Sequence, residues 1–115
     1  MEDITIVMPA VALRGMSIMP GMIAHFDISR DRSLKAVEES MQADQKIFLV
    51  TQRDVDVEEP MQSDLYEMGI VAEIKQVVKL QNDVVRILID GKSRAKLVGF
   101  TRCEAFLEAE ICPYT

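Results

Sequence analysis

Alternating apolar and polar positions divide most of the chain into short predicted strands. The first segment, Ile4–Leu13, is rich in β-branched residues, and Pro9 restricts it to a sheet edge or a bulge. Met22–Ile28 alternates again, with its apolar even-numbered residues on one face. Lys46–Gln52 is almost entirely apolar and is expected to be buried on both faces.

A helix is predicted between the second and third of these strands. Leu34, Val37 and Met41 are spaced i, i+3 and i+7, which forms a single apolar stripe on a helical surface. Ser29 and Asp31 are both candidate N-caps, because either side chain can accept a hydrogen bond from an unpaired backbone N–H.

The second half of the chain carries the clearest strand pattern. Even-numbered apolar residues from Ile70 to Leu80, Val78 among them, share one phase. Gln81–Asp83 is predicted to reverse the chain, Asp90–Gly91 to turn it again, and Asp64–Tyr66 to form a turn leading to Gly69. The strands expected in this half are Ile70–Leu80, Val85–Ile89, Arg94–Val98 and Leu107–Ile111.

Six or seven strands with one principal helix predict an α+β, mainly β fold. Consecutive hairpins favour a small barrel-like sheet with the helix plugging or covering one end. We expect residues 1–115 to form a single domain. The acidic segment Arg53–Ser63 contains Pro60 and has no period, so an exposed, mobile loop is expected there. Whether this loop contacts a partner or only solvent stays open.

Composition is that of a soluble globular domain, with 49% hydrophobic and 28% charged residues among 115. No apolar run approaches the about 18 residues that a membrane span needs, and the acidic N-terminus does not resemble a secretory signal. We therefore expect a cytoplasmic protein without membrane contacts. Cys103 and Cys112 lack metal-site spacing and are interpreted as reduced thiols, with a disulfide as the second option.

Charge is unevenly distributed along the chain. The net charge of −6 argues against a dedicated nucleic-acid binder. The stretch from Lys75 to Arg102 is nevertheless basic, because it contains seven cations and only two acidic residues, Asp83 and Asp90. These strands are the basis of an alternative hypothesis, nucleic-acid binding, although a solvated sheet face explains them as well. The seven cations are Lys75, Lys79, Arg86, Lys92, Arg94, Lys96 and Arg102.

No set of residues predicts catalysis. Gly91-Lys92-Ser93 copies the end of a phosphate-binding loop, but the required glycine five residues earlier is Arg86 and a strand follows instead of a helix. His25 is the only histidine and has no nucleophile placed beside it in the sequence. No metal-ligand or nucleotide-binding pattern is found, so no cofactor is expected in this chain.

Methionines gather between the first two predicted strands, at a turn closed by Pro20–Gly21. Two interpretations stay open: these side chains fill gaps in the core, or they form a flexible, polarisable surface that accepts varied apolar partners. Under the second interpretation the candidate protein-binding residues are Met16, Ile18, Met19, Pro20 and Met22.

Several ordered motifs resemble the N-terminal domain of the ATP-dependent Lon protease. The first group is LRGMSIMPG, the strand MIAHFDI, the helix segment SRDRSLKAVEESM and the strand KIFLVTQRD. DLYEMGIVAEIKQVVKL and VVRILIDGKSRAKLV continue the match, so the resemblance covers nearly the whole chain. Two positions depart from the family pattern, Gly15 in place of an aspartate and Ser29 in place of a glycine.

The resemblance implies a PUA-like pseudo-barrel of about six strands that serves as a substrate-recognition and assembly module in protein quality control. Its implied partners are unfolded or tagged proteins and the neighbouring subunits of a homo-hexamer. The Ser–Lys dyad and the site for ATP and magnesium would lie downstream in the parent hydrolase. This chain, which stops at Thr115, is accordingly expected to be a fragment of a much longer protease. A stand-alone Lon-like protein-binding domain and a PUA-like nucleic-acid-binding barrel using Lys75–Arg102 are the alternatives.

Overall fold

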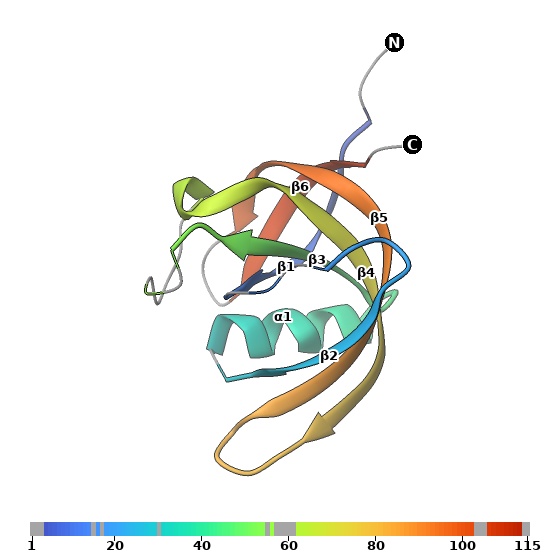
Figure 1. The fold of residues 1–115 in the computed structure, drawn as a ribbon, viewed down its shortest axis with the longest axis vertical. Helices are drawn as coiled ribbons and strands as arrows, with labels where there is room; N and C mark the ends of the chain where they lie inside the picture. Colours follow the sequence, from blue (N-terminus) through green and yellow to red (C-terminus); the bar gives the residue numbers. More distant parts are fainter. Residues whose placement is uncertain are drawn as a thin grey trace.

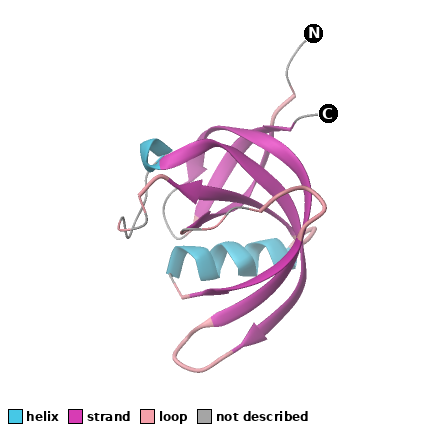
Figure 2. Ribbon diagram, viewed as in Figure 1, coloured by secondary structure: helices cyan, strands magenta, loops and turns pink. Residues whose placement is uncertain are grey.

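A computed structural model describes residues 4–14, 16, 18–29, 31–54, 56, 62–102 and 106–113 of the chain. It contains six strands, one α-helix and one short 3₁₀ helix within these residues (Figures 1 and 2). In chain order the elements are β1 (Ile6–Leu13), β2 (Ile23–Ile28), α1 (Asp31–Gln42), β3 (Lys46–Gln52), η1 (Gln62–Asp64), β4 (Leu65–Lys79), β5 (Val85–Arg102) and β6 (Leu107–Pro113).

Five of the strands form a closed ring. The sheet order is β2-β5-β4-β3-β1-β6, and an additional pairing of β5 with β6 closes β1, β3, β4, β5 and β6 into a barrel. β1 runs parallel to β3, and the other pairs are antiparallel. β2 lies outside the ring. It pairs with the first half of β5, which runs from the β4–β5 hairpin into the ring (Figure 1). The predicted barrel-like, mainly β fold with one helix is confirmed.

β5 passes through the predicted turn at Asp90–Gly91 without reversing, so that prediction was wrong. The register with β4 steps from Gly91 to Ser93, which leaves Lys92 as an extra residue in a bulge. A bulge bends a strand and increases its twist but does not end it. The single long strand therefore pairs with β2 in its first half and closes the barrel with β6 in its second half.

Two hydrophobic cores lie on opposite faces of β3, as its apolar sequence predicted. Ile47 and Leu49 belong to a core between the barrel wall and α1, whereas Phe48 and Val50 point into the barrel interior. All four side chains are buried. The helix lies along the outside of the barrel, above β2 in Figure 1, and so covers the first of these cores.

The buried face of α1 differs from the predicted stripe of Leu34, Val37 and Met41. Val37 is buried, but Leu34 is only partly buried and Met41 is exposed. Small residues complete the inner face, namely Ser33, Ala36 and Ser40. Apolar periodicity misses such a face because two of its members are serines. A serine side chain is small and can be buried at low cost when its hydroxyl makes a hydrogen bond. The capping position falls at residue 30, outside the described residues, so capping by Ser29 or Asp31 stays a prediction.

Ser40→Ala is expected to lower the free energy of unfolding by about 1.5 kcal/mol. The Ser40 hydroxyl is fully buried and donates a hydrogen bond to the backbone oxygen of Lys46 at 2.7 Å, which joins the helix to the start of β3. Alanine removes the donor and leaves that oxygen without it. Urea unfolding measures the change. Ser33→Ala is the matched control, because the Ser33 side chain is buried on the same face without a hydrogen bond among the described residues. Equal losses in both variants would contradict the assignment.

β4 begins earlier than predicted and changes phase along its length. Leu65 and Tyr66, predicted as part of a turn, are its first residues and follow η1 directly. Further along, the register with β5 shifts between Ile74 and Gln76. This irregularity turns Val77 toward the helix-side core and leaves Val78 exposed, against the predicted phase.

Other local predictions are confirmed or restricted by the structure. Asn82 and Asp83 adopt φ values of 61° and 60°, as a tight reversal between β4 and β5 requires. β1 is not an edge strand, but Pro9 faces only β6, because pairing with β3 starts at Ala10. Most of the acidic Arg53–Ser63 loop, including Pro60, lies outside the described residues.

Candidate functional site

The methionine-rich segment between β1 and β2 ends in a well-defined turn. The backbone N–H of Met22 donates to the oxygen of Met19 at 3.1 Å, with Pro20 and Gly21 at the two central positions. Gly21 has φ of 81°. Proline followed by a residue of positive φ is the pattern of a type II turn. The sequence prediction of a turn closed by Pro20–Gly21 is confirmed.

Backbone hydrogen bonds fix this turn against β5. The N–H of Gly21 donates to the oxygen of Gly91, and the N–H of Gly91 donates to the oxygen of Met22, both at 2.8 Å. A Cβ atom on Gly91 would lie 2.5 Å from the oxygen of Met19. Farther back in the segment, the hydroxyl of Thr51 donates to the oxygen of Met16 at 2.9 Å. The segment therefore lies on the barrel wall and is held at both ends.

The structure separates the candidate binding residues into three groups. Ile18 is 5% exposed and belongs to the core between the barrel and α1. Met19 and Met22 are 49% and 40% exposed, and Pro20 between them is exposed as well. Met16 is partly buried and packs against the helix-side core. Ile18 and Met16 therefore pack in or against the core, whereas binding of apolar partners by the exposed Met19, Pro20 and Met22 stays a prediction.

Met19 lines a shallow groove of about 160 Å³ on the barrel wall. Met68 of β4, which is 41% exposed, lines the same groove. Thr51 and Arg94 supply polar groups. The remaining lining is Leu13, Ile18, Leu49, Gly69 and Ile70, so that the floor is mostly apolar.

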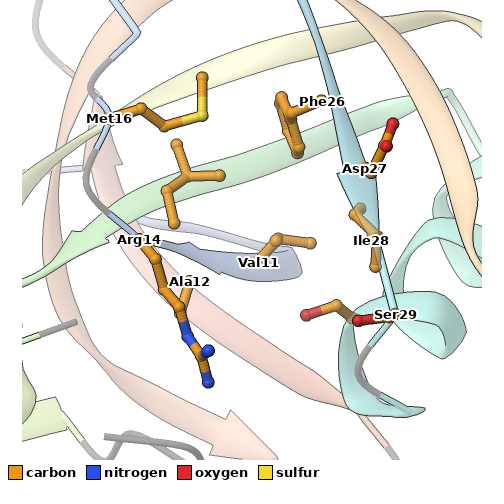
Figure 3. Close-up of a pocket in the computed structure, with 10 residues that line it drawn as sticks. Val11, Ala12, Arg14, Met16, Phe26, Asp27, Ile28 and Ser29 are labelled. Carbon is orange, nitrogen blue, oxygen red and sulfur yellow. The ribbon is translucent and has the colours of Figure 1, made fainter. Parts of the chain in front are cut away.

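Met16 lines a different pocket, of about 240 Å³, where the end of β1 faces the end of β2 and the start of α1. Figure 3 shows Met16 and Phe26 on the same side of this pocket and Arg14 on another. Asp27 also lines it and is bound through its carboxylate to Arg86, with Nε and Oδ1 2.8 Å apart. That hydrogen bond lowers the pKa of Asp27 and raises the pKa of Arg86. The carboxylate is therefore charged at neutral pH and already has a partner.

Met68 and Arg94 were not among the predicted site residues. Met68 follows the segment that was interpreted as a turn, so its place on a strand face was missed. Leu65 is buried, whereas Tyr66, Glu67 and Met68 are all exposed, so no regular alternation marks the start of this strand. Arg94 was recognised only as one of seven cations, because its position beside the groove depends on the pairing of β5 with β4.

Carboxylates neutralise part of the basic stretch. Within the described residues Lys75 pairs with Glu73, Arg86 with Asp27, and Lys92 with Asp90. Hydrogen bonding to Asp90 raises the pKa of Lys92, and hydrogen bonding from Lys75 lowers the pKa of Glu73. The seven cations therefore do not form one uniform basic surface. Single-strand nucleic-acid binders use a continuous basic groove.

The other residues considered for chemistry lie on strands. Gly91, Lys92 and Ser93 lie inside β5, so they do not form a phosphate-binding loop. His25 is an exposed residue of β2. Cys112 is a free thiol, and Cys103 lies outside the described residues. Across the residues that can be described, no helix is long and apolar enough to cross a membrane, and no three metal-ligating side chains gather into a site.

Comparison with known proteins gives one consistent result. Residues 7–114 match the family described as the ATP-dependent protease La (LON) substrate-binding domain. The Lon protease of Clostridium acetobutylicum is 44% identical over 108 residues, covering 94% of this chain and 14% of that protein. Lon protease 1 of Bacillus subtilis is 36% identical over 110 residues, covering 96% of this chain and 14% of that protein.

The fold matches solved structures too. The N-terminal domain of the Mycobacterium avium complex Lon protease superposes with a TM-score of 0.75 at 16% identity, covering 95% of this chain and 55% of that one. A Lon N-terminal domain protein from Xanthomonas campestris gives a TM-score of 0.72 at 13% identity, covering 96% of this chain and 60% of that one. The chain spans about 14% of the length of the curated relatives.

Proposed function

We propose, from the premise that this chain belongs to the family of substrate-binding domains of the ATP-dependent protease La (Lon), that it recognises protein substrates by binding their exposed apolar segments. That the chain belongs to this family confirms the resemblance inferred from the sequence motifs. The contact surface in this proposal is the groove between Met19 and Met68, with Met22 and Pro20 at its margin. Ile18 forms part of the floor and acts through packing.

One observation carries the proposal: two methionines, each about half exposed, face one apolar groove that is formed by separate parts of the chain. Methionine side chains are flexible and polarisable, so they can adapt to partners of different shape. The groove floor belongs to the rigid barrel wall, where Leu49 and Ile70 are buried. A rigid apolar floor with adaptable walls suits short apolar segments of varied sequence, which unfolded proteins expose.

The proposal also includes a wider role for this domain. We infer that proteolysis occurs elsewhere in a longer Lon protease, an ATP-dependent serine endopeptidase with a Ser–Lys dyad that uses ATP and magnesium. This domain would deliver bound segments to that machinery in the cytoplasm as part of protein quality control. We further propose that it also contacts neighbouring subunits in a homo-hexamer.

Met19→Ser combined with Met68→Ser is expected to weaken binding of a fluorescent apolar peptide about tenfold. Each methionine loses roughly 0.7 kcal/mol of apolar burial in the complex, half of what a fully buried side chain contributes. Fluorescence anisotropy with the 115-residue chain measures the affinity.

Met41→Ser is the matched control, because Met41 is similarly exposed but lies on α1. Met16→Ser tests the second pocket and is expected to leave binding unchanged. Parent-like binding by the Met19 and Met68 double variant would show that the groove is not the contact surface.

A further inference from the structure

Two cations beside the groove have no carboxylate partner among the described residues. Arg94 and Lys96 of β5 are both exposed and take part in none of the described ion pairs, whereas Arg86 and Lys92 of the same strand and Lys75 of β4 do. The chain as a whole carries a net charge of −6. An unpaired positive pair at one place on an acidic protein attracts negative groups to that place.

Strand register puts these cations at the groove. Arg94 lines it directly and pairs in register with Ile70, which forms part of the floor. Lys96 pairs in register with Met68, the methionine on the β4 side. Residues that are directly opposite on neighbouring strands have Cβ atoms about 5 Å apart. Both cations also share the outer face of β5, since Ala95 and Leu97 between and beyond them point into the barrel.

We propose that the groove selects segments in which an apolar residue is accompanied, within two positions, by aspartate or glutamate. This inference rests on the proposed function and specifies its substrate class: apolar segments with nearby carboxylates bind more tightly than neutral or basic ones. The apolar side chain enters the groove between Met19 and Met68, and the carboxylate faces Arg94 or Lys96. Alternate residues of an extended segment are about 6.6 Å apart, which is also the spacing of these two cations along β5.

The same features favour a peptide over a single-stranded nucleic acid. Among the described residues, the groove is lined by aliphatic side chains and methionines together with Gly69, Thr51 and Arg94, and none of these offers an aromatic ring on which a base could stack. Tyr66, the nearest aromatic residue along β4, already lies under the guanidinium of Arg53, whose carbon is 4.9 Å from the ring centroid. A peptide, by contrast, can bind without a stacking ring, because its carboxylate groups can pair with the two cations and its apolar side chain can pack on the groove floor.

Three fluorescent peptides with one apolar core and flanking Asp, Ser or Lys residues test the proposal. The Asp peptide is expected to bind the 115-residue chain about fivefold more tightly than the Ser peptide, and the Lys peptide more weakly than either. This preference corresponds to two exposed ion pairs of ordinary strength. It is expected to shrink when the salt concentration rises from 0.05 M to 0.5 M, because exposed charges are screened.

Arg94→Gln combined with Lys96→Gln is expected to remove the preference, so that the Asp peptide binds this variant no more tightly than the Ser peptide. The matched control is Lys35→Gln combined with Lys79→Gln, which changes the net charge equally but removes exposed lysines of α1 and of the β4–β5 hairpin. The control is expected to retain at least three-quarters of the preference. Thermal unfolding of all variants confirms that they are folded.

The outcomes separate this inference from the proposed function. Equal binding of all three peptides, or an equal loss of preference in both double variants, overturns the charge selection while apolar binding stands. Failure of every peptide to bind the parent chain overturns the proposed function itself. A single-stranded oligonucleotide that binds through Arg94 and Lys96 and displaces the Asp peptide would also overturn the inference, because the cations would then serve a nucleic-acid site.

Discussion

Gly69→Ala is expected to lower the free energy of unfolding by about 3 kcal/mol and the melting temperature by about 12 °C. A Cβ atom at this position would lie 2.4 Å from Cζ of Phe48 and 2.6 Å from the backbone oxygen of Leu49. Phe48 is fully buried in the barrel interior, so its ring has no free space to move into. Gly69 is not among the residues of positive φ, so the cost comes from this contact and not from backbone strain.

A second substitution tests that cause. Phe48→Leu removes the ring atoms nearest to the new methyl group. The loss of unfolding free energy in the double variant is therefore expected to be smaller, by at least about 1 kcal/mol, than the two single losses added together. Recovery stays partial, because the oxygen of Leu49 is unchanged. Gly21→Ala is the control for backbone strain, since Gly21 has positive φ and no atom near its Cβ position. Parent-like stability of Gly69→Ala in urea unfolding would contradict the packing described for β3 and β4.

Local sequence patterns were sufficient for most elements of this fold. The run of apolar residues from Lys46 to Gln52 predicted a strand with two buried faces, because a strand that separates two cores has no polar side. Gln81–Asp83 predicted a tight reversal, since asparagine and aspartate tolerate the left-handed conformation found there. Pro20–Gly21 predicted the turn in the same way, since glycine tolerates the positive φ that a type II turn requires after proline. In each case the cause acts within a few residues of the chain.

Features that depend on pairing between strands were not predictable in this way. The bulge at Lys92 keeps β5 continuous through Gly91, yet a glycine beside an aspartate is also a normal turn signal. The shift near Lys75 reverses the faces of Val77 and Val78 without a trace in the apolar pattern. The groove has the same origin: Met68 and Arg94 join Met19 only through the register of β4 with β5 and the position of the segment between β1 and β2.

Gly91→Ala is expected to reduce apolar-peptide binding more than tenfold and to lower the free energy of unfolding by about 2 kcal/mol. The added Cβ would lie 2.5 Å from the oxygen of Met19 and 3.3 Å from Cγ2 of Ile18. Two hydrogen bonds also join Gly91 to the backbone of Gly21 and Met22. Relief of the contact requires the turn to move away from β5, which carries Met19 out of the groove.

The two glycine variants serve as controls for each other, because they crowd different places. Gly69→Ala strains the barrel interior, whereas Gly91→Ala displaces the turn on the outer wall. Binding is therefore compared by anisotropy well below the lower of the two melting temperatures, where both proteins are folded. Gly69 itself lines the groove, but its added methyl group would point to Phe48 in the barrel interior, so we expect Gly69→Ala to lose less affinity than Gly91→Ala despite its larger loss of stability. If Gly91→Ala binds as tightly as the parent while its stability falls, the position of Met19 against β5 does not determine recognition.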